Sequence, residues 1–329
     1  MAFWVKWSAV MCDQDVYLGI DTSCYTTSVA LLNKAGQLVG EARRILQVKA
    51  GGRGLQQSEM VFQHTRNLPV LMEEVFTSPY KIIGIGVSAR PRPLATSYMP
   101  AFLAGLCVAR SLAAANKVPL YQLSHQENHL EAGLWSAQGP GAGRFLLLHA
   151  SGGTTDLLLA AQGTDGNYSL TQVGGSIDLH AGQFIDRVGV ALGLQFPAGP
   201  ALEQLAATAG ALVDLPVAVR QGDVSLSGPA TAALRKLAAG AEPAALAAGV
   251  QFVLAETFVR MIRNVAAQQN VFDVLLVGGV ASNAAIRSHL IEKLAKRRIK
   301  VWLPASKFSP DNAVGCAAYA RRQGESSYA

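Results

Sequence analysis

The sequence has little charge, few cysteines and no long uninterrupted hydrophobic run. Charged residues make up 15% of its 329 residues and hydrophobic residues 50%, which is ample apolar material for a large core and for two domains. Its longest apolar runs, such as "FLLLHASGG" and "VLLVGGVA", are broken by glycine or polar residues well before the roughly 20 residues that a membrane span needs. We therefore expect a globular, soluble protein with no transmembrane helix and no membrane partner.

Cysteine usage excludes two further classes of protein. The four cysteines are widely scattered and form no CxxC pair: Cys12, Cys24, Cys107 and Cys316. Neither a disulfide framework nor a zinc–thiolate site is indicated, and the expected location is the reducing cytoplasm. The start "MAFWVKWSAVMCDQD" has too short an apolar piece for a signal peptide and no small-residue cleavage site, so it is interpreted as a non-essential leader.

The balance of charge is basic. A formal net charge of +6 fits a polyanionic partner such as a nucleic acid. Many ordinary enzymes are equally basic, so charge alone changes the expected function only slightly.

Two segments repeat one pattern of apolar strand, polar turn and second apolar strand. The first runs from Val16 to Val39, with the hydroxyl-rich corner "DTSCYTT", a second strand, the turn "NKAG" and a third strand. The second runs from Phe145 to Gly174, with the corner "SGGTT" at residues 151–155. Two copies of one hairpin unit predict two related lobes.

A third glycine corner lies in "DVLLVGGVASNAAIRSHL", from Asp273 to Leu290. Here a buried strand is expected to run through a Gly-Gly turn into a helix capped by Ser282 or Asn283. Glycines let the backbone approach a ligand closely, and successive N–H groups with Ser and Thr hydroxyls can donate to phosphate oxygens. Any one of these corners can equally be an ordinary tight turn. Three of them in this order favour a nucleotide site between two lobes.

Two histidines stand four residues apart in "LYQLSHQENHLEAGLW", residues 120–135, a run interpreted as an amphipathic helix. At this spacing His125 and His129 project from one helix face on adjacent turns, so their imidazoles can converge on one ion. Two structural or surface histidines are the alternative that the pattern leaves open. Glu127, between them, is expected to point off this face into solvent.

Six motifs occur in the order and spacing of one known family. They are "GIDTSCYTTSVAL", "LSHQENHLEAGL", "LLLHASGGTTDLLLA", "GGSIDLHAGQFIDRVGVALGLQFPAGPALEQLA", "LVGGVASNAAIRSHL" and "SPDNAVGCAAYA". Together they span about Val16 to Ala320 and resemble the TsaD family of tRNA threonylcarbamoyladenosine transferases, formerly called glycoproteases.

The resemblance implies an α/β fold with two lobes, the actin/Hsp70/sugar-kinase-like fold that duplicates an RNase H-like unit and binds a nucleotide. The N-terminal lobe is expected at residues 16–118 and the C-terminal lobe at 119–329. The second of these is expected to hold the histidine pair, the second phosphate hairpin and the adenosine corner. The last helix, from Asp311 onward, is expected to pack back onto the N-terminal lobe.

The resemblance also implies site residues. It makes His125, His129 and Asp311 the ligands of one divalent metal ion, iron or zinc. It assigns a nucleotide, threonylcarbamoyl adenylate or ATP and AMP, to the following residues: His149, Ala150, Ser151, Gly152, Gly153, Asp186, Gly199 and Asn283. The candidate catalytic residues are Asp21, Ser23, Arg90 and Arg92. Some have plainer alternatives, since Asp186 can cap or pair on a helix and Gly199 can be only a turn.

The implied reaction is metal-assisted transfer of a threonylcarbamoyl group from threonylcarbamoyl adenylate to the exocyclic nitrogen of an adenosine in the anticodon loop of tRNA. The expected partners are tRNA and TsaB-like and TsaE-like proteins. Candidate tRNA contacts are Arg43, Arg44, Lys49, Arg53, Lys296, Arg297, Arg298 and Lys300. Basic residues at a helix end are commonly only solvated, which is the alternative for the last four.

Departures from the family pattern indicate a divergent paralogue. Tyr25 and Thr26 replace an acidic pair in the first corner, and Thr154 stands where the family has histidine. The loop "SARPRPLATSYMP" replaces a small glycine loop and places Arg90 and Arg92 between prolines, where they can bind phosphate or a substrate carboxylate or simply belong to a stiffened surface loop.

These departures leave other functions open. One alternative is a different enzyme of the same fold, such as another carbamoyl or acyl transferase or a small-molecule kinase. A second is a nucleotide-binding scaffold protein. A protease is not indicated, because HxxxH lacks the glutamate of HExxH.

Overall fold

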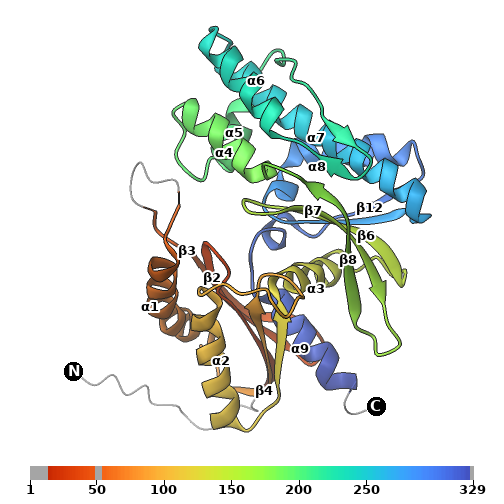
Figure 1. Ribbon diagram of the computed structural model, residues 1–329. Coiled ribbons are helices and arrows are strands. Elements are labelled where there is room, and N and C mark those ends of the chain that lie inside the picture. Colours follow the sequence, from red (N-terminus) through yellow and green to blue (C-terminus); the bar gives the residue numbers. More distant parts are fainter. Residues whose placement is uncertain (1–13, 49–53, 327–329) are drawn as a thin grey trace.

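The computed structural model describes residues 14–48 and 54–326 of the chain. Most of the expected leader lies outside this part, as do the candidate tRNA contacts Lys49 and Arg53. The described chain forms two lobes, each built on one β-sheet with helices packed against it (Figure 1).

The first lobe holds a five-stranded sheet with the order β3-β2-β1-β4-β5. Strands β1, β2 and β3 pair antiparallel, whereas β4 and β5 run parallel to β1. Helices α1 and α2 bury their apolar side chains against one face of this sheet. The bounds are β1 Gln14–Asp21, β2 Thr26–Asn33, β3 Leu38–Ile45, α1 Gln57–Val75, β4 Tyr80–Arg90, α2 Phe102–Asn116 and β5 Leu120–Ser124.

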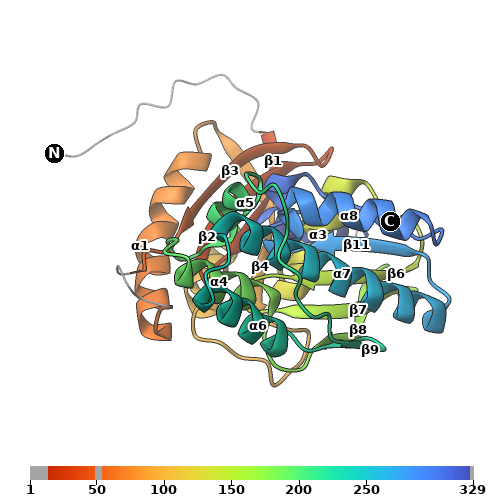
Figure 2. The ribbon, with the colours of Figure 1, turned by 90° about the horizontal axis from the view of Figure 1, so that it is seen from above.

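The second lobe holds a seven-stranded sheet with the order β12-β11-β6-β7-β8-β10-β9. Its strands are β6 Arg144–Ala150, β7 Thr155–Gln162, β8 Tyr168–Ser176, β9 Val219–Arg220, β10 Asp223–Val224, β11 Asp273–Val277 and β12 Lys300–Trp302. Its helices are α4 Ala181–Ala191, α5 Gly199–Ala206, α6 Ser227–Ala238, α7 Pro243–Gln269 and α8 Ala284–Ala295, with the 3-10 turns η1 Val280–Ser282 and η2 Ser306–Phe308. Figure 2 shows α6, α7 and α8 over this sheet.

The second sheet repeats the first. Its strands β8-β7-β6-β11-β12 correspond to β3-β2-β1-β4-β5, with antiparallel pairs among the first three and parallel pairs to the last two. The strand and corner pattern therefore predicted the hairpins correctly, and the duplication confirms the two-lobed actin/Hsp70/sugar-kinase-like fold class.

Two helices cross between the lobes. Helix α3, His125–Ala137, follows the first sheet but packs on β11 of the second, where a Cβ on Gly133 would lie 2.9 Å from the Leu275 side chain. Helix α9, Val314–Ser326, follows the second sheet but packs on β1 and β4, where Gly86 faces the backbone of Cys316. Figure 1 shows the two helices side by side between the lobes. The lobes are therefore joined by exchanged helices.

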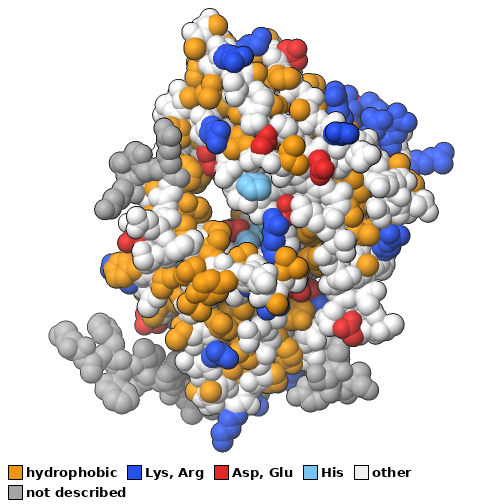
Figure 3. Space-filling model, viewed as in Figure 1, with side chains coloured by type: hydrophobic (Ala, Val, Ile, Leu, Met, Phe, Trp, Pro, Cys, Tyr) orange, Lys and Arg blue, Asp and Glu red, His pale blue; other side chains and the backbone are white. Residues whose placement is uncertain are grey.

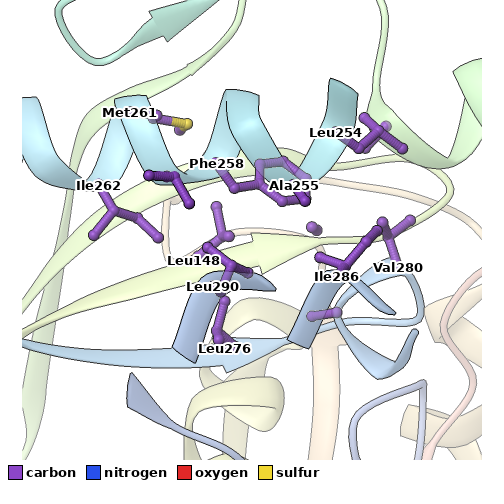
Figure 4. Packing of buried hydrophobic residues seen from close by; sticks show 14 of the residues in the cluster. Leu148, Leu254, Ala255, Phe258, Met261, Ile262, Leu276, Val280, Ile286 and Leu290 are labelled. Carbon is purple, nitrogen blue, oxygen red and sulfur yellow. The ribbon is translucent and has the colours of Figure 1, made fainter. Parts of the chain in front are cut away.

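Helix α7 forms the centre of the second core. Figure 4 shows Phe258 of α7 above Leu148 of β6 and Leu290 of α8, with Ile286 of α8 below Ala255. By length and composition α7 is also the one described helix apolar enough to cross a membrane, but 72% of that apolar window is buried inside the fold. This burial is typical of a core helix.

The stretch from Leu120 to Trp135 is not one helix, contrary to the prediction. Strand β5 pairs with β4, so the first sheet continues to Ser124, beyond the expected lobe boundary at residue 118. The Ser124 hydroxyl accepts a hydrogen bond from the backbone N–H of Glu127, and the Glu127 carboxylate accepts one from the backbone N–H of Ser124. This capping box begins the helix at His125, and it corrects the expectation that Glu127 points into solvent.

Candidate functional site

The two histidines of the HxxxH motif lie in the first two turns of α3. Their Nε2 atoms are 3.1 Å apart. The Oδ1 atom of Asp311 lies 3.4 Å from Nε2 of His125 and 3.2 Å from Nε2 of His129. One ligand atom from each of the three residues lies within 4.8 Å of the others, as binding of a single ion requires. Figure 3 shows a hollow between the lobes with histidine and acidic side chains at its floor.

The first corner places a buried carboxylate behind this cluster. Asp21, at the end of β1, is 0% exposed and accepts hydrogen bonds from the hydroxyls of Ser23, at 2.7 Å, and Ser88. Its Oδ2 atom lies 3.5 Å from Nδ1 of His125, the ring nitrogen that faces away from Asp311. A carboxylate beside the outer nitrogen of a ligand histidine fixes the orientation of the ring.

The charges in the cluster are strongly coupled. Burial lowers the pKa of His125, but the carboxylates of Asp21 and Asp311 outweigh burial and raise this pKa to about 10. Burial acts to raise the pKa of Asp311, but the hydrogen bonds from His125 and His129 hold it well below its usual range. The cluster therefore favours a positive charge beside the ionised carboxylate of Asp311.

His149 lies against the histidine pair, closer than its place in the sequence indicates. It stands one residue before the end of β6, and its ring centre is 4.4 Å from that of His129. It is 1% exposed, and neither ring nitrogen has a hydrogen-bond partner among the described residues. Burial and the neighbouring histidines lower its pKa well below the usual value, so the ring is neutral. A neutral imidazole with free nitrogens beside His129 is a fourth candidate donor.

The second corner has open backbone donors. Ser151 N–H donates to the Thr154 carbonyl at 2.8 Å, which closes the turn, while Gly152 and Gly153 are exposed. The N–H groups of these two glycines make no hydrogen bond within the described part of the chain. Gly182 of α4 allows this helix to start directly against the corner, because its N–H donates to the Ser151 carbonyl at 3.1 Å. Two free N–H groups beside a helix N-terminus form an anion site.

The third corner connects the end of β6 to the loop that carries Asp311. Gly278 has a φ of +99°, which favours glycine, and lies against the carbonyl of Ala150 at the end of β6. Its N–H donates to the carbonyl of Ser309 at 2.8 Å, and the Ser309 hydroxyl donates back to the Gly278 carbonyl at 3.1 Å. Ser309 stands two residues before Asp311, so this turn positions the carboxylate of the cluster.

The residues expected on the adenosine side lie around α5 and α8. Asn283 caps α8 by accepting the N–H of Ile286 at 2.9 Å, as the sequence predicts for one of two residues. Glu203 of α5 accepts the N–H of Ala284 at 2.7 Å. A cavity of about 420 Å³ lies beside this junction, lined by residues that include Glu203, Phe252 and Ala284.

Asp186 and Gly199 meet at one turn. Asp186 Oδ1 accepts the N–H of Ala198 at 2.8 Å, and Gly199 then begins α5. Burial raises the pKa of Asp186, against the effect of this hydrogen bond. A Cβ on Gly199 would meet nothing within 4 Å, so the space beside this glycine is open.

Arg90 and Arg92 separate in the structure. Arg92 pairs with Asp156 at 3.0 Å, and Gln126 donates to the same Asp156 oxygen at 2.9 Å. This contact joins the loop after β4 to the strand after the second corner. Arg90 ends β4 beside Ser124, and its Nε atom is buried with no partner among the described residues. Of the two arginines, only Arg92 therefore has an ion-pair partner within the described chain.

The residues that depart from the family pattern face the same region. The ring of Tyr25 meets that of Phe196 edge-on, with centres 6.1 Å apart, so the first corner reaches the turn that carries Gly199. Thr26 begins β2 and is 9% exposed. Thr154 completes the second corner. The described first corner thus holds one carboxylate, that of Asp21.

The candidate tRNA contacts divide into paired and unpaired residues. Arg43 donates to the Lys307 carbonyl, Arg44 pairs with Glu74, and Lys296 pairs with Glu292. Lys300 lies over the ring of Trp302 at 3.7 Å. The exposed side chains of Arg297 and Arg298 make no ion pair within the described chain.

Several features of this region were not expected from the sequence: the side chains of Ser88, Asp156 and Glu203, and the position of His149 against His129. Glu203 carried a weak signal, because it follows Gly199 by four residues on the same helix. His149 carried another, because it directly precedes a corner that returns to the cleft. Ser88 and Asp156 reach the site only through strand pairing across the fold.

Two duplicated lobes, three corners at the ends of their strands and a His–His–Asp cluster define a two-lobed protein of the actin and sugar-kinase fold class. Solved structures agree on the fold. The activator of 2-hydroxyisocaproyl-CoA dehydratase from Clostridium difficile, with bound ADPNP, matches with a TM-score of 0.54 at 13% identity over 95% of this chain and 97% of that one. A ROK-family glucokinase from Streptomyces griseus, in complex with glucose and AMPPNP, matches with a TM-score of 0.55 at 10% identity over 93% and 99%.

Sequence comparison identifies the family. The sequence model described as "TsaD: tRNA N6-adenosine threonylcarbamoyltransferase" matches residues 57–318, and the chain belongs to this family. It is a transferase, and its relatives associate it with tRNA modification.

The relatives are distant. A tRNA N6-adenosine threonylcarbamoyltransferase from Prochlorococcus marinus (strain NATL1A) is 32% identical over 94% of this chain and 91% of its own. A probable bifunctional tRNA threonylcarbamoyladenosine biosynthesis protein from Methanothermobacter thermautotrophicus is 30% identical over 90% of this chain. The chain spans about half of that bifunctional protein, 53% of its length.

Proposed function

We propose that this chain transfers a threonylcarbamoyl group from threonylcarbamoyl adenylate to the exocyclic nitrogen of an anticodon-loop adenosine in tRNA. The observation that carries the proposal is that the His125–His129–Asp311 cluster lies against the ring of His149, three residues before the open glycine corner at Gly152 and Gly153. In the reaction the new N–C bond forms, the bond between carbonyl carbon and phosphate oxygen breaks, AMP leaves and one amine proton is released.

The donor set fits one divalent ion, iron or zinc. Two imidazoles and a carboxylate converge, and His149 adds a buried ring with both nitrogens unpartnered. When bound, such an ion supplies Lewis-acid stabilisation of negative charge on oxygen. Asp21 holds the outer nitrogen of His125 and so orients the ring.

The protein's own groups hold the donor. The free N–H groups of Gly152 and Gly153 bind its phosphate, and Asp186 of α4, whose carboxylate reaches the turn before α5, binds its ribose. Asn283 and Glu203 border the adenine side. Arg90, with its unpartnered Nε, binds the carboxylate of the transferred group. These contacts position the carbonyl carbon for attack by the base.

The partners and compartment belong to the same proposal. The substrate is tRNA, whose unpaired anticodon loop can present a single base. TsaB-like and TsaE-like proteins are the proposed partners, and the cytoplasm is the proposed location. The candidate catalytic residues Asp21 and Ser23 orient the ring of His125. The Asp21 carboxylate accepts a hydrogen bond from the Ser23 hydroxyl and lies beside the outer ring nitrogen of His125.

The test is a transfer assay on the full chain. The zinc- or iron-loaded protein, supplied with threonylcarbamoyl adenylate and unmodified tRNA, should produce threonylcarbamoyladenosine, detected by mass spectrometry of digested tRNA. His125→Ala with His129→Ala should lose bound metal and product together. Arg260→Ala is the control, because the exposed Arg260 pairs with Glu256 and lines neither cavity. Product from the double variant at the wild-type rate would overturn the metal assignment.

One observation favours a second candidate, a transferase of the same fold with a different acyl donor or acceptor. Tyr25 and Thr26 stand where the resembling family has an acidic pair, and the Tyr25 ring reaches Phe196 across the site. Nucleotide and metal binding without threonylcarbamoyladenosine formation would support this candidate. If the wild type binds neither nucleotide nor metal, the chain is better interpreted as a scaffold protein.

A further inference from the structure

A second hollow lies at the opposite end of the second sheet. It has a volume of about 670 Å³, within the range of about 300–1,000 Å³ typical of ligand sites. We call it the α7–β12 pocket, and the lining residues that matter here are Gln221, Arg263, Asn264, Gln268, Phe272 and Arg297. No aspartate or glutamate is among the described residues that line it.

The charges of the pocket are not neutralised. Arg263 and Arg297 are exposed, and neither makes an ion pair or side-chain hydrogen bond within the described chain. The neighbouring carboxylate, Asp273, accepts the indole N–H of Trp302 at 2.7 Å. Lys and Arg side chains gather at this edge of the molecule, over the end of α8 (Figure 3). The pocket therefore favours an anionic ligand.

An aromatic ring and amides add a second kind of contact. Phe272 is 46% exposed, although it sits directly before a buried strand. Asn264 and Gln268 lie on the exposed face of α7, one turn apart. The Asn264 amide donates to the backbone carbonyl of Gln221 at 3.0 Å and keeps its side-chain oxygen as an acceptor, whereas Gln268 offers both an amide donor and an acceptor. An exposed ring flanked by guanidinium groups and amides is the combination that stacks and reads an unpaired base.

The pocket is separate from the transferase site. Phe272 precedes the start of β11, whereas the third corner begins at Gly278 after its end. The strand has five residues, which is about 17 Å of extended chain. A ligand that reaches both places must therefore be extended.

We propose that the α7–β12 pocket binds an unpaired nucleotide of the substrate RNA at a place distant from the modified base. The ring of Phe272 stacks on the base, and Arg263 and Arg297 bind the adjoining phosphates. That the RNA is tRNA rests on the proposed function. An acidic protein segment is disfavoured, because the pocket offers a stacking ring and amides as well as positive charge.

The experiment measures binding of unmodified full-length tRNA and of its isolated anticodon stem-loop to the full chain, at several salt concentrations. Arg263→Gln with Arg297→Gln should weaken tRNA binding about tenfold and reduce the salt slope by about 1.4. Phe272→Ala should weaken it about tenfold, whereas Phe272→Tyr should bind as wild type. The charge-matched control is Arg235→Gln with Lys236→Gln, two exposed residues of α6 in the same lobe.

The outcomes separate the two proposals. Stem-loop binding that is the same in all variants would place the bound nucleotide outside the anticodon stem-loop, and stem-loop binding that weakens together with tRNA binding would place it inside; both results support the pocket. Wild-type tRNA affinity in the Phe272→Ala and arginine variants would overturn the pocket while leaving the transferase intact. Equal weakening by the α6 control, or equal competition by polyglutamate, would show non-specific attraction and also overturn it. If the wild type binds tRNA through the pocket but produces no threonylcarbamoyladenosine, the proposed function is rejected and the pocket proposal stands.

Discussion

The corner between β1 and β2 and the corner between β6 and β7 occupy matching positions in the duplicated sheets, yet they differ in burial and in hydrogen bonding. In the first corner Asp21 and Ser23 are 0% exposed and satisfy one another. In the second, Gly152 and Gly153 are exposed and their N–H groups are free. One corner is closed around a carboxylate and the other is open to an anion.

This difference shows how a duplicated unit acquires a single asymmetric site. The first corner acts on the protein itself, because its carboxylate holds the outer nitrogen of His125. The second leaves two backbone N–H groups without a partner in the described chain, and these are the groups that we propose bind a ligand. The exchanged helices bring the histidines and Asp311 together. Helix α3, which follows the first sheet, carries the two histidines, and the loop before α9, which follows the second sheet, carries Asp311. The predictions below test this division of roles.

Gly86→Ala should have the largest effect on stability. A Cβ there would collide with the Cys316 carbonyl, so α9 must move away from the first sheet. We expect a loss of about 3 kcal/mol in the free energy of unfolding, measured by urea denaturation. Gly228→Ala, where a Cβ meets nothing within 4 Å, should instead gain about 0.5 kcal/mol. Equal stabilities of the two variants would mean that α9 does not clamp the lobes.

Asp21→Asn should show that the carboxylate at the first corner supports metal binding, whereas Asp156 at the second corner does not. We expect zinc affinity to fall about 10- to 100-fold, because the outer nitrogen of His125 loses its charged partner. Asp156→Asn, at the second corner, should leave zinc affinity unchanged, because Asp156 faces Arg92 and Gln126. Zinc titration of both variants measures this. A matching loss in Asp156→Asn would remove the distinction between the corners.

Gly182→Ala should weaken nucleotide binding about tenfold without loss of metal. Its Cβ would lie 2.7 Å from the Ser151 carbonyl, which pushes α4 away from the open corner. AMP affinity by calorimetry and metal content by elemental analysis give the two readouts. Unchanged AMP affinity would show that the open corner does not hold the phosphate.

Asp178→Asn should change the pH dependence of stability. Burial acts to raise the pKa of Asp178, but hydrogen bonds from Ser225, Ser227 and two backbone N–H groups hold it well below its usual range. A depressed folded-state pKa contributes stability above the unfolded value near 4 and loses it as pH falls through the folded value. After allowance for solvent screening, we expect Asp178→Asn to cost about 1 kcal/mol at pH 7. The deficit should shrink below pH 4 in denaturation curves, and a constant deficit would contradict this.

The duplicated hairpins could be predicted because their signals are local. Alternating apolar strands and glycine corners place β1, β2, β6 and β7 without reference to distant residues. The spacing of His125 and His129 likewise specifies one helix face. The pattern S-x-x-E at Ser124 is the sequence signature of a capping box and marks the start of the helix. The apolar stretch before it has no feature that distinguishes a strand from a helix.

The remaining contacts could not be predicted because they depend on how strands pair across the fold. His149 faces His129 only because β6 runs beside α3, and Asp156 meets Arg92 only across the two lobes. The free guanidinium of Arg90 is a result of that same pairing. Sequence treated the two arginines alike, while the structure gives one a protein partner and leaves the other for a ligand.

The most direct test of the account is the affinity for AMP measured with and without zinc, in the wild type and in His125→Ala with His129→Ala. If metal cluster and open corner share one cleft, zinc should tighten AMP binding to the wild type at least about fivefold, by attraction of the phosphate. The double variant should show no dependence on zinc. Equal AMP affinity of the wild type with and without bound zinc would contradict the claim that the two lobes build one site.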